Sequence, residues 1–260
     1  MEHQPAWVIS FPKSGRTWLR VMLGKALCEE YHLDEGALLD FDEIARSIGA
    51  GTMDFSHDAS SFEKGFRFDE IETSKEKYKE SAVVLLVRDP RDVIVSCYFQ
   101  ASKREKRFDG TLTSFLHDER FGIRKCAAFH RIWAENQHVP KRFLLVRYED
   151  MQRDPESALR SVLDVLGILQ VSSPAIQHAI SFGDFDNMKK LESSGYFNNP
   201  IMKPRNADDP ESFKVRRGKV GGYRDYLSDS DCAYVNEILA GEGGPFYTPY
   251  LDATDTGAVA

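Results

Sequence analysis

Hydrophobic and polar residues follow one another in the same order three times along this chain. Each block has a short apolar run, a polar turn, and a stretch with apolar residues at helical spacing. In the first block the apolar run covers residues 6–11 and the helical pattern covers residues 15–31. The apolar residues at helical spacing are Leu19, Leu23, Ala26 and Leu27. This block predicts a buried strand followed by a helix.

The second block starts with a β-rich run at residues 82–87. Asp89 is a suitable helix N-cap, and Pro90 suits the first helical position. The block therefore predicts a strand and a helix that continues to about residue 104.

The third block leads from an apolar run at residues 143–146 through the letters RYEDMQRDP. Asp154 caps the helix expected there, Pro155 follows it, and Gly167 marks its end. A last helix is expected at residues 229–240.

Strands that alternate with helices predict an α/β fold with a central, mainly parallel β-sheet flanked by helices on both faces. Ligands of such sheets bind beyond the carboxyl ends of the strands, where helix N-termini point. No internal repeat or Pro/Gly/Ser-rich linker divides the chain. We therefore expect a single domain over residues 1–260, with its core at about residues 6–240 and a flexible tail at residues 241–260.

Two segments have no regular pattern. Residues 41–79 are polar and interrupted, and one or two short helices are expected there. Residues 192–222 are rich in Gly, Asn and Pro, which predicts a long functional loop.

Composition narrows the class of protein. The chain has 42% hydrophobic and 29% charged residues, typical of a globular protein, and it contains no apolar stretch that could span a membrane. The first five residues lack the pattern of a signal peptide, so a cytoplasmic location is expected. The net charge of -7 argues against nucleic-acid binding, and the four separated cysteines predict neither a metal site nor disulfides.

The first polar turn, PKSGRTW, has the composition of an anion-binding loop. Free backbone N–H groups at the helix start can hold an anion, and Lys13 adds a mobile positive charge. A nucleotide-binding loop of kinases and GTPases reads G-x-x-x-x-G-K-[ST], whereas the lysine here precedes Gly15 and Trp18 follows closely. An ordinary strand-to-helix turn with a lysine is the alternative.

This turn resembles the phosphosulfate-binding loop of sulfotransferases that use 3′-phosphoadenosine 5′-phosphosulfate (PAPS). The usual loop of that family has threonine where this chain has Arg16. The resemblance implies a P-loop-like turn whose contacts to the donor come from Lys13, Ser14, Gly15, Arg16, Thr17 and Trp18.

A second anion site is needed to select PAPS, because this nucleotide carries a separate phosphate on its ribose. In RDPRDVIVS, Arg88 ends the second strand and Ser96 lies about two helical turns later, so the two could clamp one phosphate. A surface ion-pair cluster is the alternative. The stretch resembles the family's 3′-phosphate motif R-N-P-x-D-x-x-x-S, with Asp89 in place of asparagine.

The long loop contains VRRGKVGGYRDY, a basic and glycine-rich stretch that could fold over a nucleotide. It resembles the family signature R-K-G-x-x-G-D-W, with Gly222 for aspartate and Tyr223 for tryptophan. The resemblance implies that Arg216, Arg217 and Gly218 contact the 3′-phosphate.

Aromatic residues are expected around the adenine, which needs an apolar stacking slot. Trp18 and a phenylalanine of SFGDFDNMKKLE resemble the adenine-binding parts of the family. Phe182 and Phe185 both remain open, and Phe185 is preferred because Asp-Asn-Met follows it. Tyr148 resembles another nucleotide contact, although ordinary core packing explains each aromatic as well.

Sulfuryl transfer needs charge stabilisation on the leaving oxygen and a base for the acceptor. The resemblance assigns these roles to Lys13 and His57, with Asp58 or Glu63 as alternative bases, and implies no metal. The expected function is transfer from PAPS to an alcohol, phenol or amine of a small molecule, with PAP as the product. A P-loop small-molecule kinase and a non-catalytic nucleotide-binding module are the alternatives; the oligomeric state is open, and a homodimer is compatible with the sequence.

Overall fold

The computed structural model describes residues 4–197, 202 and 210–252. Its strands are β1 (Ala6–Ser10), β2 (Met53–Ser56), β3 (Ala82–Val87) and β4 (Arg142–Arg147). The helices before β4 are α1 (Arg16–Glu30), α2 (Phe41–Ile48), α3 (Pro90–Phe99), α4 (Leu112–His117) and α5 (Ile123–Glu135). Those after it are α6 (Tyr148–Arg153), α7 (Pro155–Val165), α8 (Ser173–Phe182), α9 (Phe185–Ser194), α10 (Asp229–Glu242) and α11 (Thr248–Asp252).

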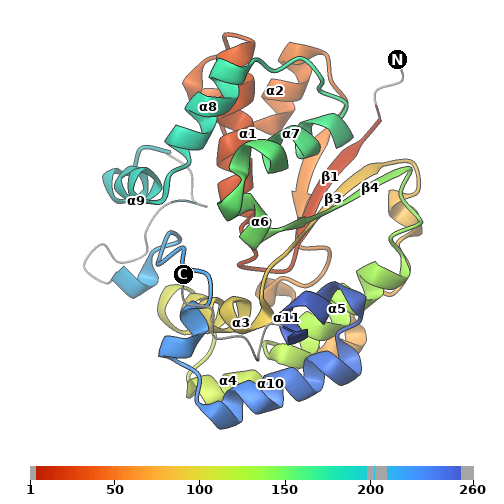
Figure 1. Cartoon of the computed structure of the whole chain (residues 1–260), viewed down its shortest axis with the longest axis vertical. Coiled ribbons are helices and arrows are strands. Elements are labelled where there is room, and N and C mark those ends of the chain that lie inside the picture. Colours follow the sequence, from red (N-terminus) through yellow and green to blue (C-terminus); the bar gives the residue numbers. More distant parts are fainter. Residues whose placement is uncertain (1–3, 198–201, 203–209, 253–260) are drawn as a thin grey trace.

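The strands form one parallel sheet in the order β2-β1-β3-β4 (Figure 1). In register, Ala6 of β1 lies between Met53 of β2 and Ala82 of β3, and Ala82 also pairs with Arg142 of β4. All pairs being parallel, the carboxyl ends of the strands meet at one edge of the sheet. The predicted α/β fold with a central parallel sheet between helices is therefore confirmed.

Helices cover both faces of the sheet because the strand side chains alternate in direction. Val83, Leu85 and Val87 of β3 pack with α3, α5 and α10, whereas Val84 and Leu86 pack with α1, α7 and α8. Figure 1 shows these two groups of helices on opposite sides of the sheet. Both faces of β3 are thus buried, as its continuous apolar run predicts.

Strand β2 was not predicted. Its four residues lie within the segment 41–79, for which the sequence predicted only short helices, and only one of them is fully buried. A strand at the sheet edge needs no apolar run on both faces, so its pattern is too weak to recognise from sequence. The short helix α2 does occur in this segment, capped by the Asp40 side chain.

The helix predicted up to residue 104 ends earlier. Helix α3 stops at Phe99 and continues as a π-helical turn, Gln100–Arg104. Such turns are rare and are often found at functional sites. Part of the predicted loop 192–222 is helical, because α9 extends to Ser194. Residues 198–201 and 203–209 of that loop lie outside the described residues.

The tail predicted to be flexible from residue 241 is folded up to residue 252. Pro245–Tyr247 forms a single 3-10 turn, and α11 follows it directly. Phe246 and Tyr250 are buried, and Tyr247 is fully buried against His130. The prediction failed because these aromatic residues are packed by distant elements rather than by a pattern of their own. Residues 253–260 lie outside the described part of the chain.

Candidate active site

The turn after β1 has a strained backbone that supports an anion site. Lys13 has φ 69° and Gly15 has φ 97°, both in the left-handed region. A Cβ atom on Gly15 would lie 2.6 Å from Cδ2 of Tyr148, so only glycine allows the turn to pack on that ring. The Ser14 hydroxyl is buried and has no partner within the described structure.

This turn opens onto a cavity of about 580 Å³ at the carboxyl edge of the sheet. Its size is within the usual range of small-molecule sites. All predicted site residues line the cavity except Ser14, which lies beneath the turn. The predicted site residues that line the cavity are Lys13, Gly15, Arg16, Thr17, Trp18, His57, Arg88, Ser96, Tyr148, Phe185, Arg216, Arg217 and Gly218. Six separate segments of the sequence therefore converge on one site.

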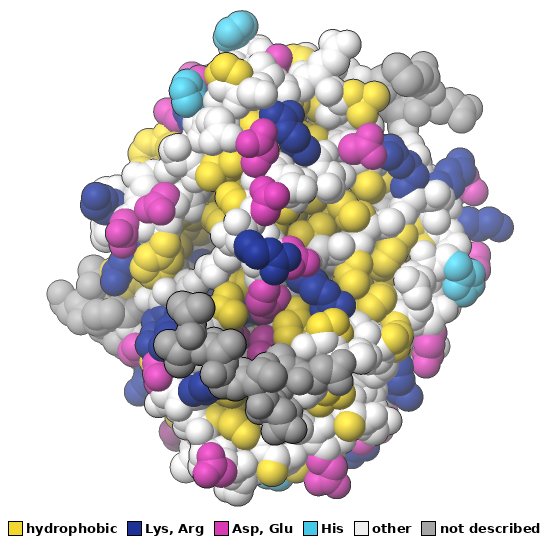
Figure 2. Space-filling model, viewed as in Figure 1, with side chains coloured by type: hydrophobic (Ala, Val, Ile, Leu, Met, Phe, Trp, Pro, Cys, Tyr) yellow, Lys and Arg dark blue, Asp and Glu magenta, His cyan; other side chains and the backbone are white. Residues whose placement is uncertain are grey.

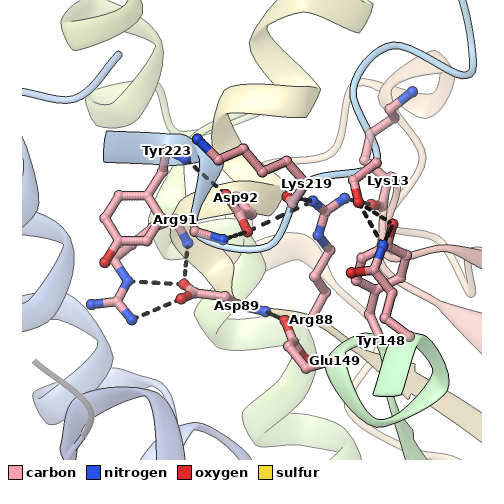
Figure 3. A network of polar contacts seen from close by, with 12 residues as sticks. Lys13, Arg88, Asp89, Arg91, Asp92, Tyr148, Glu149, Lys219 and Tyr223 are labelled. Atoms are coloured by element: carbon pink, nitrogen blue, oxygen red, sulfur yellow. Dashed lines mark hydrogen bonds and ion pairs between the residues drawn. The ribbon is translucent and has the colours of Figure 1, made fainter. Parts of the chain in front are cut away.

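Arg88 joins the lysine turn to the long loop (Figure 3). Its Nη1 donates to the carbonyl of Lys13 at 3.4 Å, and its Nη2 donates to the carbonyl of Lys219 at 3.0 Å. The guanidinium lies 4.3 Å from the centre of the Tyr148 ring. Asp92 is 3.7 Å away and balances part of its charge. Arg88 and Lys13 are thus neighbours although 75 residues separate them.

Asp92 also holds the glycine-rich part of the long loop. Its two carboxylate oxygens accept hydrogen bonds from the backbone N–H groups of Gly221 and Tyr223, each at 2.8 Å. Burial raises the pKa of Asp92, and Arg88 opposes this effect. Asp89, which stands where the resembled motif has asparagine, caps α3 and forms an ion pair with Arg91 at 2.7 Å. The RDPRDVIVS motif therefore anchors the glycine-rich VRRGKVGGYRDY motif (Figure 3).

The two arginines of the long loop have acidic neighbours. Arg216 Nη1 lies 3.0 Å from Glu211 and donates to the Tyr226 hydroxyl at 2.8 Å. Its guanidinium also lies 4.2 Å from the centre of the Phe99 ring. Arg217 pairs with Asp225 at 2.5 Å. These contacts hold both cations at the cavity wall.

Three aromatic residues form one end of the cavity. Trp18 donates from Nε1 to the Gly183 carbonyl at 2.8 Å, and its ring meets Tyr148 edge-on at 5.6 Å. Phe185 packs on Gly218, where a Cβ would lie 2.5 Å from its Cδ2.

Phe182, the other phenylalanine considered, has a different environment. It is not among the cavity-lining residues and packs against Tyr196 and Phe197. The amino group of Lys25 lies 5.2 Å from the centre of its ring. Of the two phenylalanines, only Phe185 faces the cavity.

Lys13 is half-buried among other positive charges. Burial and then the nearby Lys214 ammonium lower the pKa of Lys13 to about 7. Its Nζ donates to Oε1 of Gln100 at 3.4 Å. The cavity floor therefore has a positive field with too little negative charge to balance it, which favours an anion.

His57 lies at the end of β2, next to the end of β1. Its Nδ1 is 2.8 Å from the carbonyl oxygen of Ser10, an acceptor, so Nδ1 carries the proton and Nε2 remains as the proton acceptor. Burial, together with Arg16, lowers the pKa of His57 well below its ordinary value. The ring is therefore neutral at physiological pH.

The two carboxylates considered as alternative bases lie in different places. Glu63 lines the main cavity and is exposed. Asp58 does not line it; its carboxylate lies 2.8 Å from both Lys75 and Lys77. Asp58 is thus fully engaged by cations away from the cavity.

The cavity residues that were not anticipated include Lys214, Gln100 and Glu105. Burial, Arg104 and Arg16 lower the pKa of Lys214 to about 8. Lys214 lies two residues before the Arg216 motif, so a signal was present but outside the resembled signature. Gln100 and Glu105, hydrogen-bonded to each other at 2.6 Å, flank the π-helical turn, which has no sequence pattern.

The residues that the structure describes contain no group of three or more His, Cys, Asp or Glu side chains able to hold a metal ion. Within the same ranges, no helix has both the length and the apolar character needed to cross a membrane. Basic and acidic side chains are interspersed over the face shown in Figure 2.

Comparison with solved structures supports the same fold. A mouse sulfotransferase, SULT7A1, in complex with PAP aligns with a TM-score of 0.67 at 17% identity, covering 98% of this chain and 90% of that one. Retinol dehydratase, in complex with androsterone and PAP, aligns with a TM-score of 0.58 at 17% identity, covering 100% and 83%.

Sequence comparison identifies similar enzymes. Flavonol 3-sulfotransferase of Flaveria bidentis is 22% identical over 90% of this chain and 80% of its own length. Cytosolic sulfotransferase 13 of Arabidopsis thaliana is 24% identical over 84% of this chain and 70% of its own length. The model of the sulfotransferase domain matches residues 3–242, nearly the whole chain. This chain therefore belongs to the sulfotransferase family and is an enzyme of sulfuryl transfer.

Proposed function

We propose that this enzyme transfers the sulfuryl group of PAPS to a hydroxyl or amine of a small molecule. The observation that carries the proposal is the convergence of two cationic clusters on one cavity. Lys13 and Arg16 of the turn form the first cluster, with Arg88 bonded to the Lys13 carbonyl, and Arg216 with Arg217 of the long loop forms the second. PAPS has two separated anionic groups, and each would meet one cluster.

The residues at the site fit such a nucleotide. Several buried polar atoms have no hydrogen-bond partner among the described residues: the Ser14 hydroxyl, Nη1 of Arg16 and Nε of Arg88. Buried donors are normally satisfied, so these atoms are available to oxygen atoms of an anionic ligand. Phe185 and Trp18 offer an apolar slot for the adenine, next to the polar groups.

The proposed reaction is a displacement at sulfur, with Lys13 at the leaving oxygen and His57 at the acceptor. The acceptor oxygen or nitrogen attacks sulfur, and the sulfur–oxygen bond to the phosphate breaks. Lys13, in its protonated form, stabilises the negative charge that develops on the leaving oxygen. His57 accepts the proton of the acceptor at Nε2, while Ser10 holds its Nδ1–H. Sulfuryl transfer of this kind depends mainly on positioning and charge.

The acceptor is expected to bind near Ser61, Phe62 and Gln100, which line the cavity beyond His57. These side chains combine an apolar surface with hydrogen-bonding groups. Relatives with similar sequences include a flavonol sulfotransferase, so phenols are the first acceptors to test, followed by aliphatic alcohols and amines.

The proposal is tested by incubation with radiolabelled PAPS and a panel of phenols, alcohols and amines. We expect transfer by the wild type and a decrease in kcat of about 10²-fold or more in Lys13→Ala and His57→Ala. Lys190→Ala and His138→Ala are matched controls, because both side chains are exposed outside the cavity. Tight ATP binding without binding of PAP, measured by calorimetry, would contradict the proposal.

A further inference from the structure

The turn after His57 has an unusual backbone. Asp58 has φ 41° and Ala59 has φ 67°, although neither is a glycine. Two successive residues of this kind persist only where the surrounding structure holds them, and such strain is concentrated at functional sites.

A buried ion pair provides the anchor. The Asp58 carboxylate lies 2.8 Å from Nζ of Lys75, and neither side chain is exposed to solvent. It also accepts a hydrogen bond from the Tyr78 hydroxyl at 2.8 Å and lies 2.8 Å from Nζ of the half-exposed Lys77. Burial alone would raise the pKa of Asp58, but Lys75, Lys77 and Tyr78 lower it overall. The carboxylate is thus charged and tied to the segment that precedes β3.

Local hydrogen bonds complete the turn on both sides of His57. The backbone N–H of Asp58 donates to Oγ of Ser56 at 2.9 Å. The carbonyl of His57 accepts from the N–H of Ser60 at 2.8 Å and from its Oγ at 2.6 Å. The main chain of His57 is therefore held from both directions, while its ring is held by the Ser10 carbonyl.

We propose that Asp58 is a positioning residue for His57. Its buried carboxylate holds the left-handed turn, so that the imidazole keeps Nδ1 on Ser10 and leaves Nε2 to the cavity. Asp58 does not line the main cavity, so it acts through His57 and not on the substrate. The inference rests on the proposed role of His57 as the base.

Removal of the Asp58 carboxylate should displace His57 for two physical reasons. Without the Asp58 carboxylate, the Lys75 ammonium is left buried without its counter-charge, and the turn can relax to negative φ. Either change moves the backbone of His57 and weakens the hydrogen bond at Nδ1. A displacement of about 1 Å at a catalytic group is enough to lower a rate by roughly 10²-fold.

The kinetic test compares Asp58→Ala, Asp58→Asn and a control of similar stability, Leu239→Ala. Leu239 is buried in α10, in a helix that covers one face of the sheet. We expect Asp58→Ala to lower kcat at least tenfold, with KM for PAPS and Kd for PAP changed less than twofold. The kcat of Asp58→Asn should decrease less than that of Asp58→Ala, because asparagine tolerates positive φ. If Leu239→Ala lowers kcat as much at the same melting temperature, the effect is one of stability and the proposal is wrong.

A double variant tests whether Asp58 acts through His57. The kcat of His57→Ala/Asp58→Ala should equal that of His57→Ala alone, since no base remains to be positioned. A further decrease would overturn the proposal. If Asp58→Ala does not fold, Asp58→Asn/Lys75→Met replaces it, because this pair of changes removes both buried charges together.

A spectroscopic measurement separates this inference from the proposed function. By NMR of ¹⁵N-labelled histidine, His57 of the wild type should be neutral, with the proton on Nδ1, at pH values where an ordinary histidine is already charged. In Asp58→Ala its pKa should rise toward the ordinary value. An unchanged pKa and tautomer would overturn the positioning role. Absence of sulfuryl transfer in the wild type would instead contradict the proposed function and leave this measurement intact.

Discussion

Among single residues, the site depends on partly buried groups whose protonation is shifted by their surroundings. Burial and the positive charges around them lower the pKa of both Lys13 and Lys214, and the nearby Glu192 carboxylate opposes only part of this effect. His57 is kept neutral by burial and by Arg16. The same positive field therefore favours binding of an anionic ligand at Lys13 and Lys214. It also keeps His57 neutral, so that its ring can accept a proton.

Ligand binding should be linked to proton uptake. Lys13 and Lys214 have pKa values of about 7 and about 8, so at pH 8 both are partly deprotonated in the free enzyme. An anion favours their charged forms and raises both pKa values, so PAP should bind with uptake of about one proton at pH 8 and should bind more weakly as pH rises from 7 to 9. Calorimetry in two buffers of different ionisation enthalpy measures this uptake.

The matched variant for this measurement is Lys13→Arg, which stays charged throughout the range. It should take up fewer protons than the wild type. A binding enthalpy that does not depend on the buffer at pH 8 would show that neither lysine titrates on binding.

At the scale of elements, the segment Arg216 to Asp225 has to fold over the cavity as a tight backbone structure. Gly218 has φ 60° and lies directly against Phe185, while its carbonyl accepts from the Tyr148 hydroxyl at 3.2 Å. Asp92 holds the N–H groups of the following turn. The loop is therefore positioned by side chains from α3 and α6 rather than by a regular pattern of its own.

Gly218→Ala should weaken nucleotide binding without unfolding the protein. The new Cβ would lie 2.5 Å from Phe185 and would require a positive φ, so the loop has to move. We expect the Kd for PAP, measured by calorimetry, to rise about 10-fold, a cost of about 1.4 kcal/mol. Gly241→Ala is the control, because a Cβ there meets nothing within 4 Å. Equal affinity of both variants would argue against a role of this loop in binding.

At the scale of the whole molecule, the chain after α10 closes the core on one face of the sheet. The ring of Phe246 stacks on Phe143 of β4 with centroids 6.4 Å apart, and its carbonyl accepts from Arg147 at 2.8 Å. The Tyr250 hydroxyl donates to Glu149 at 2.7 Å, and Glu149 in turn accepts from the N–H of Asp89 at 2.9 Å. The C-terminal turns are thus connected to the strand ends that form the site.

Phe246→Ala should therefore destabilise the protein as a core substitution does. Removal of a buried phenylalanine side chain costs about 3 to 5 kcal/mol in the free energy of unfolding, because it leaves a cavity. Leu169→Ala, at a side chain that is 74% exposed, should change the stability by less than about 0.5 kcal/mol. Denaturant unfolding compares the two. A negligible effect of Phe246→Ala would mean that this segment is a loose tail after all.

The amino-acid pattern alone predicts the fold class, three of the four strands and most of the lining of the site. Residues 6–11, 82–87 and 143–146 are apolar enough to predict buried strands, and the caps Asp89 and Asp154 lie where α3 and α7 start. Parallel strands bring their carboxyl ends to one edge, so motifs that follow strands had to meet there.

Features that depend on contacts between distant segments could be recognised only in the folded chain. The edge strand β2, the π-helical turn after Phe99 and the folded tail have no periodic pattern, because their neighbours supply the stabilising contacts. The same holds for Lys214 in the cavity and for the choice of Phe185 over Phe182. The local pattern of hydrophobic residues predicts which face of a helix or strand is buried. A shifted pKa or a buried ion pair such as that of Asp58 and Lys75 arises only when residues from separate segments come within a few ångströms of each other.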